Sequence, residues 1–103
     1  MTTNEYNKYC KSLKSTTYVN QWGGAHVWKV GGKVFAIAGW SKDNALAVSF
    51  KVSDHNFEVL RDRPGFKPAP YLASREMKWI QQYDTTGDLA GELKYYVSES
   101  EYL

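Results

Sequence analysis

Cysteine and proline are scarce in this chain of 103 residues, and it contains no long run of apolar residues. A single cysteine, Cys10, cannot form an intramolecular disulfide and belongs to no metal-ligand spacing, so a small fold stapled by disulfides or zinc is excluded. The longest apolar stretch, Val34 to Ala38, is far shorter than the roughly 20 residues that cross a bilayer, and no signal peptide precedes it. We therefore expect a cytoplasmic protein without membrane association.

Groups that could carry catalysis or hold a metal are scarce as well. The chain has two histidines, His26 and His55, and neither has a cysteine or a second histidine at ligand spacing. Residues Asp84 to Asp88 resemble the start of a calcium loop, but Tyr95 stands where the bidentate glutamate would be. Neither Gly-Gly pair precedes a helix that could hold a phosphate. The sequence predicts a protein that is not an enzyme and needs no cofactor.

Aromatic residues, in contrast, are abundant, with four Trp, eight Tyr and four Phe. A chain of this length can form one hydrophobic core of useful size, which predicts a single domain over residues 1–103. A core of that size does not need so many aromatic side chains, so some are expected at the surface, where they indicate a binding face. We expect this domain to be a monomer.

A helix is predicted to begin at the N-terminus, because Thr2 and Glu5 have the spacing of a capping box. Apolar residues then recur at three- and four-residue spacing and share one helical face: Tyr6, Tyr9, Cys10 and Leu13. Three lysines occupy the other face: Lys8, Lys11 and Lys14. The helix is therefore predicted to be amphipathic, with a basic outer surface.

Five strands are predicted, at residues 18–22, 26–30, 33–40, 45–52 and 78–83. Gly31 and Gly32 tolerate the positive φ of a type I′ turn, so the strands on either side of them are expected to form a hairpin. Residues 45–52 alternate between large apolar side chains and small or polar ones. This alternation predicts one packed face and one open face for that strand.

Two further helices complete the predicted plan. The second is expected to begin at Ser53 or Asp54 and to end before Pro64, and the third to be capped by Thr86 or Asp88. Several consecutive strands with few helical crossovers are typical of antiparallel pairing. The pattern predicts an α+β fold, a two-layer sandwich in which an antiparallel sheet carries helices packed on one side.

Charge is distributed unevenly along the chain. Residues 1–53 carry seven lysines against Glu5 and Asp43, whereas residues 84–103 carry Lys94 against five carboxylates. A basic region of this kind would attract a polyanion, while the acidic C-terminal helix would repel one. The alternative is that these lysines are solvated and serve solubility.

Four short blocks of sequence carry a resemblance to a known family. They are Lys33–Ala36, Val48–Lys51, Pro64–Leu72 and Lys78–Ile80. In this order and spacing, and over nearly the whole chain, they resemble the MmcQ/YjbR family. The resemblance implies a frataxin-like (CyaY-like) α+β fold, and members of the family are described as DNA-binding proteins with a double-wing motif.

DNA binding is therefore the leading hypothesis, with affinity that comes mainly from cations that neutralise phosphates. No helix with base-reading Arg, Asn or Gln stands out, so sequence preference should be weak. Trp40, in the loop after the third predicted strand, could insert into a groove or stack on a base. The expected phosphate contacts are the strand and loop cations Lys29, Lys33, Lys42, Lys51, Arg63, Lys67, Arg75 and Lys78.

The alternative hypothesis is a protein-interaction module. It would use exposed aromatic side chains and the rigid segment Pro68-Ala69-Pro70 as its contact surface, and its binding would depend little on salt. Iron handling, which the frataxin-like fold suggests, needs a cluster of carboxylates on the first helix. That helix has Glu5 among three lysines, which argues against iron.

Overall fold

The computed structural model describes residues 1–39, 45–70 and 78–103. Its helices are α1 (Thr3–Ser12), α2 (Asp54–Leu60) and α3 (Asp88–Ser100). Its strands are β1 (Thr16–Gln21), β2 (Ala25–Val30), β3 (Lys33–Ala38), β4 (Val48–Lys51), β5 (Phe66–Pro68) and β6 (Trp79–Gln82). Among the helices of the described ranges, none is long and apolar enough to cross a membrane.

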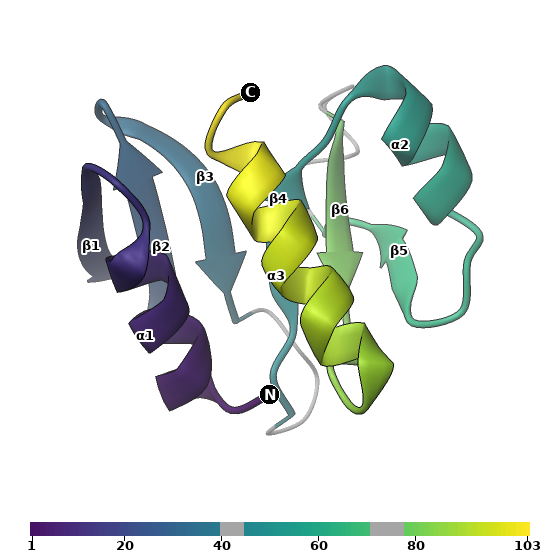
Figure 1. The fold of residues 1–103 in the computed structure, drawn as a ribbon, viewed down its shortest axis with the longest axis horizontal. Helices are drawn as coiled ribbons and strands as arrows, with labels where there is room; N and C mark the ends of the chain where they lie inside the picture. Colours follow the sequence, from purple (N-terminus) through teal and green to yellow (C-terminus); the bar gives the residue numbers. More distant parts are fainter. Residues whose placement is uncertain (40–44, 71–77) are drawn as a thin grey trace.

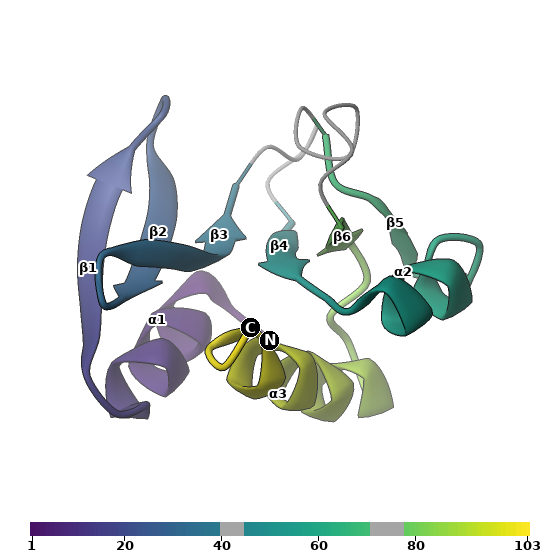
Figure 2. The ribbon, with the colours of Figure 1, turned by 90° about the horizontal axis from the view of Figure 1, so that it is seen from above.

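The strands form one sheet in the order β1-β2-β3-β4-β6-β5, and every neighbouring pair is antiparallel. The helices lie on one side of this sheet, with α1 below β1 and β2, α3 below the middle, and α2 beside β5 (Figures 1 and 2). The predicted α+β fold, with helices packed on one side of an antiparallel sheet, is confirmed.

Two tight turns connect the first three strands. Gly31 and Gly32 join β2 to β3 with φ values of 57° and 78°, as expected for a turn that requires positive φ. Trp22 precedes Gly23 and Gly24 in the turn between β1 and β2 and itself adopts a φ of 56°. The predicted hairpin at Gly31-Gly32 is confirmed.

The main core lies between the sheet and the helices. Phe50 and Ile80 from the sheet meet Leu93 and Val97 of α3, and all four side chains are fully or almost fully buried. Burial of such side chains is the dominant favourable contribution to folding. Ser100 adds a polar link, because its Oγ donates to the carbonyl of Phe35 and accepts from the backbone N–H of Lys51, both at 2.9 Å. The core therefore positions α3 against β3 and β4.

The sheet face away from the helices is buried around Ala47 and Ser49, which corrects part of the expectation of an open face on residues 45–52. Ala45 and Lys51, expected on the same face, are exposed. Ala47 and Ser49 were expected on that open face, but both are buried. The register places Ser49 between Ile37 of β3 and Gln81 of β6, next to a second apolar cluster that includes Trp79. A central strand has neighbours on both sides, so alternation of its own sequence does not reveal whether its second face is solvated.

The first two helix starts agree with the sequence. At α1 the backbone N–H of Glu5 donates to Thr2 Oγ1 at 3.1 Å, and the backbone N–H of Thr2 donates to the Glu5 carboxylate at 3.0 Å. These two bonds form the predicted capping box, and the bond from the Thr2 backbone N–H to the carboxylate lowers the pKa of Glu5. Ser53 caps α2 by accepting from the backbone N–H of Asn56 at 3.2 Å.

The start of α3 differs from the prediction. Neither Thr86 nor Asp88 caps the helix; the capping position is Gly87, with a φ of 57° and no side-chain hydrogen bond. The Thr86 hydroxyl instead donates to Asp84 at 2.7 Å, and this bond contributes to lowering the pKa of Asp84. Local bonding inside the turn competes with capping and prevails here.

Candidate functional site

Three of the nine residues predicted to contact DNA, Trp40, Lys42 and Arg75, lie outside the described residues. Lys33 begins β3 beside the Gly31-Gly32 turn and is exposed. The remaining five lie on β2, β4 and β5, in the connection between α2 and β5, and directly before β6.

The alternation of side chains along the strands assigns three lysines to the sheet face away from the helices: Lys29, Lys51 and Lys67. They stand on β2, β4 and β5, and since neighbouring strands lie about 4.8 Å apart, β2 and β5 are separated by roughly 19 Å. The Nζ of Lys51 donates to the carbonyl oxygen of Leu103 at 3.3 Å. The Nζ of Lys67 lies 5.9 Å from the ring centroid of Tyr83. These three lysines therefore belong to the same face of the sheet but do not come together in one site.

Arg63 and Lys78 interact with groups of the protein itself. Arg63 forms a two-point ion pair with Glu92 of α3, at 2.5 and 2.8 Å, which raises the pKa of Arg63 and lowers that of Glu92. The guanidinium also lies 4.9 Å from the ring centroid of Phe66. The Nζ of Lys78 lies 4.7 Å from the ring centroid of Phe57 on α2. Both cations therefore have a structural role at the β5 end of the sheet.

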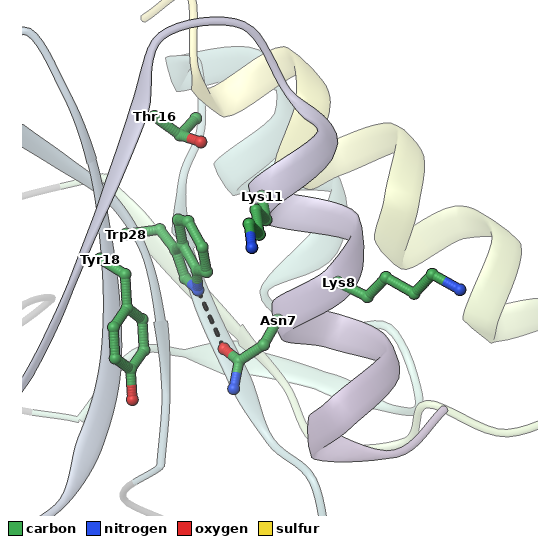
Figure 3. Close-up of a pocket in the computed structure, with 6 residues that line it drawn as sticks. All are labelled: Asn7, Lys8, Lys11, Thr16, Tyr18 and Trp28. Carbon is green, nitrogen blue, oxygen red and sulfur yellow. Dashed lines mark hydrogen bonds between the residues drawn. The ribbon is translucent and has the colours of Figure 1, made fainter.

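At the opposite end of the sheet, an open groove of about 740 Å³ lies between α1 and the β1–β2 pair (Figure 3). Its walls come from the helix on one side and from the two strands on the other. The lining residues are Asn7, Lys8, Lys11, Thr16, Tyr18 and Trp28. We call this feature the α1–β1 groove.

Two aromatic rings form the strand wall of the α1–β1 groove. Tyr18 and Trp28 are paired directly in the register of β1 and β2, and their ring centroids lie 5.2 Å apart. Trp28 is only 5% exposed, whereas Tyr18 is 45% exposed, so Tyr18 presents aromatic surface to solvent. The buried indole thus supports an accessible phenol ring.

A hydrogen-bond chain joins these rings to α1. The indole N–H of Trp28 can only donate, and it donates to Asn7 Oδ1 at 2.9 Å (Figure 3). The Asn7 amide nitrogen therefore faces His26 Nδ1, at 3.4 Å, and must be the donor. The Tyr18 hydroxyl forms a hydrogen bond with the same ring nitrogen at 2.7 Å. The Tyr6 hydroxyl adds a bond to the His26 carbonyl at 3.1 Å.

The helix wall supplies two lysines. In Figure 3, Lys11 extends between α1 and the ring of Trp28, whereas Lys8 points away from the aromatic rings, toward α3. Lys8 also lines a second hollow of about 370 Å³, shared with Tyr9 and with Lys94 of α3. Neither Lys8 nor Lys11 forms an ion pair within residues 1–39, 45–70 and 78–103.

The sequence pattern places Lys8 and Lys11 on the outer face of a basic helix, but neither is among the residues predicted to contact DNA. The capping box and the three- and four-residue spacing predict which face of α1 is apolar. They do not reveal which strands the helix packs beside. The sequence feature that came closest to predicting the groove is a pair of aromatic residues on neighbouring predicted strands, Tyr18 and Trp28.

The groups around the groove suit binding of an anion and a flat ring. Lysines supply positive charge, and Tyr18 supplies an exposed aromatic face. Burial raises the pKa of the nearby Cys10 thiol to about 12, so this thiol is protonated at neutral pH and is not a nucleophile. In the part of the chain that the structure describes, no three His, Cys, Asp or Glu side chains gather as a metal site would require.

The segment expected to serve an interaction module, Pro68-Ala69-Pro70, begins at the last residue of β5 and is held against β6. Ala69 is buried in the second apolar cluster, and its backbone N–H donates to the carbonyl of Trp79 at 3.0 Å. Among the other exposed aromatic residues, Trp22 follows β1, Tyr83 follows β6, and Tyr95 lies on α3. These side chains lie on separate elements.

Comparisons with known proteins agree with this fold. A crystal structure of a protein from Pseudomonas syringae, determined by the Northeast Structural Genomics Consortium, superposes with a TM-score of 0.69 at 15% identity, over 96% of this chain and 97% of that chain. At this identity the likeness shows the fold alone. No curated protein matches the sequence. The sequence profile named YjbR matches residues 11–100, and because this match covers most of the molecule, the chain belongs to the YjbR family.

Proposed function

We propose that this protein is a DNA-binding protein without catalytic activity and that it holds phosphates at the α1–β1 groove. One observation carries the proposal: Lys8 and Lys11 stand on one wall of an open groove whose other wall presents the exposed ring of Tyr18. The resemblance of the sequence blocks to a family described as DNA-binding supports the same conclusion.

The two lysines suit phosphate contact because neither of them forms an ion pair in the described ranges. Binding a phosphate then releases counterions without first breaking an ion pair. Arg63, in contrast, would have to leave Glu92 before it could bind DNA. Contacts to phosphate position a protein on DNA without reading its bases, so we expect weak sequence preference.

As part of this proposal we take the protein to be a cytoplasmic monomer. Cys10 is the single cysteine of the chain and is buried, so no disulfide of its own requires an oxidising compartment. Sedimentation at micromolar concentration, with and without DNA, tests the monomeric state.

Fluorescence anisotropy with a labelled duplex at about 50 and about 200 mM salt tests DNA binding. We expect the affinity of the wild type to fall steeply with salt, with a log–log slope of roughly −0.9 per phosphate contact. The double variant Lys8→Gln/Lys11→Gln should bind about 10-fold more weakly at the lower salt and have a shallower slope.

The matched control is Lys29→Gln/Lys67→Gln, which removes the same charge from the other sheet face. It should retain most of the affinity. Absent or salt-independent binding of the wild type would refute DNA binding. An equal loss in the control would show that the phosphate contacts are not confined to the α1–β1 groove.

A further inference from the structure

We infer that the α1–β1 groove prefers single-stranded nucleic acid, with one unpaired base stacked on Tyr18 and the neighbouring phosphates at Lys11 and Lys8. This inference rests on the proposed function and names the form of nucleic acid that the groove accepts.

Tyr18 has the properties of a prebuilt stacking platform. Its hydroxyl is held by His26 Nδ1 at 2.7 Å, and its ring contacts Trp28 on one side, with the ring centroids 5.2 Å apart. The ring is nevertheless 45% exposed. A ring that is already held at its hydroxyl and supported by a neighbour loses little conformational freedom when a base stacks on it.

The polar groups of the groove have partners within the protein. Asn7 bonds Trp28 through its oxygen at 2.9 Å and faces His26 through its nitrogen at 3.4 Å. The Thr16 hydroxyl donates to the backbone carbonyl of Cys10 at 2.9 Å. Because these groups are engaged by neighbours, stacking is expected to be the main contact to the base. Any base has an aromatic face, so this contact tolerates different sequences.

The lysines mark a path for the backbone across α1. Lys8 lines both the α1–β1 groove and the second hollow, so the two openings share a cation. On the far side of the second hollow, the Nζ of Lys94 lies 5.7 Å from the ring centroid of Tyr9. Glu5 is the one carboxylate among the residues of that hollow, and it accepts from the backbone N–H of Thr2. Lys11, Lys8 and Lys94 are thus spaced across the surface from the groove at β1, over α1, to α3.

A duplex cannot use the whole of this surface. Inside a duplex both faces of each base are covered by its neighbours in the stack, so Tyr18 could reach a base only after that base had left the helix. The phosphates of a duplex could still contact Lys8 and Lys11. The groove is therefore expected to bind both forms through phosphate and to gain affinity for single strands through stacking.

The test compares Tyr18→Ala with Tyr18→Phe on four labelled probes at one salt concentration. The probes are an oligothymidylate of about ten nucleotides, the equivalent oligouridylate, and a DNA and an RNA duplex of the same length. We expect the wild type to bind at least one single strand about 10-fold more tightly than the corresponding duplex. Tyr18→Ala should weaken that single-strand binding about 10-fold, which is more than it weakens duplex binding, whereas Tyr18→Phe keeps the ring and should retain most of the single-strand affinity.

Each outcome separates this inference from the proposed function. Preferred binding of either single strand supports the inference, and the ratio between oligothymidylate and oligouridylate identifies which polymer is favoured. Equal binding of duplex and single strand, or single-strand binding that Tyr18→Ala does not change, overturns it even if Lys8→Gln/Lys11→Gln still weakens every complex. Circular dichroism of Tyr18→Ala, a change at an exposed side chain, verifies that the variant is folded.

Discussion

The two ends of the sheet use their positive charges differently. At the β5 end, Arg63 is ion-paired with Glu92, and Lys78 lies over the ring of Phe57. At the β1 end, Lys8 and Lys11 form no ion pair in the described part of the chain and flank an aromatic groove. Each of these pairs has two cations, so the difference lies in the groups that each cation contacts. Net charge along the sequence is therefore a poor guide to where a polyanion would bind.

The largest effect is expected from removing an aromatic side chain at the β5 end. Phe66 is buried, and its ring centroid lies 6.0 Å from that of Tyr96. Phe66→Ala should lower the free energy of unfolding by about 3–4 kcal/mol through lost burial and an unfilled cavity. The corresponding change at the β1 end, Tyr18→Ala, should cost less than about 1 kcal/mol because that ring is half exposed. Urea denaturation of both variants measures the contrast, and equal losses would contradict it.

An intermediate effect is expected from Asn7, which joins α1 to the strands. Asn7→Ala leaves the indole N–H of Trp28 without its partner, and that N–H is mostly buried. The free energy of unfolding should fall by about 1–2 kcal/mol.

The control for Asn7 is a double-mutant cycle with Trp28→Phe, which removes the indole donor and keeps an aromatic ring. The two single changes should be coupled by about 1 kcal/mol, because each removes the same hydrogen bond. Simple additivity in urea denaturation would show that the bond between Asn7 and Trp28 does not stabilise the fold.

A smaller, pH-dependent effect is expected from the ion pair at the β5 end. The hydrogen bonds from Arg63 lower the pKa of Glu92 in the folded protein, so the folded state binds fewer protons at this site than the unfolded chain. The resulting stabilisation is present above the ordinary glutamate pKa, near 4.5, and is lost as the pH falls through the lowered value. Because both side chains are about one-third exposed, solvent screening reduces it to about 0.5–1 kcal/mol.

Glu92→Gln tests this ion pair by urea denaturation at several pH values. It should destabilise the protein at pH 7 and have a diminishing effect as the pH falls below 4.5. The matched control is Glu58→Gln, which breaks a more exposed pair with Arg61 at 3.8 Å and should change stability by less than about 0.3 kcal/mol. A loss for Glu92→Gln that does not vary with pH would mean that packing, and not charge, is responsible.

The smallest effect on stability is expected from the lysines of the groove. Lys8→Gln and Lys11→Gln should each change the free energy of unfolding by less than about 0.5 kcal/mol, because neither removes an ion pair among the described residues. Thermal or urea unfolding gives the value. A loss above 1 kcal/mol for either variant would indicate a structural role and would remove the contrast between the two ends of the sheet.

Local features of the fold could be predicted where neighbouring residues decide the structure. Thr2 and Glu5 satisfy each other's backbone within one helical turn, and Gly31 and Gly32 supply a positive φ that other residues adopt at a cost. The covered face at Ser49 could not be predicted, because the residues that flank it belong to β3 and β6. Nor could the ion pair of Arg63 with Glu92, whose partners are 29 residues apart.

The candidate site also combines features that the sequence predicts with features that depend on the tertiary structure. Its basic helix could be recognised from spacing alone, and the aromatic residues from composition, but their meeting depends on how α1 packs against β1 and β2. The bonds from Tyr6 to His26 and from Trp28 to Asn7 establish that arrangement. Each joins residues about 20 positions apart, so no local window contains both partners.

By itself, the amino-acid order determined the caps of α1 and α2, the Gly31-Gly32 turn and the α+β class, because these follow mainly from interactions within a few residues of the chain. Only the tertiary structure decided which cations are paired with carboxylates or rings and which face a groove. That choice depends on distances between elements remote in sequence, and electrostatic and stacking interactions act over a few ångströms of space irrespective of separation along the chain.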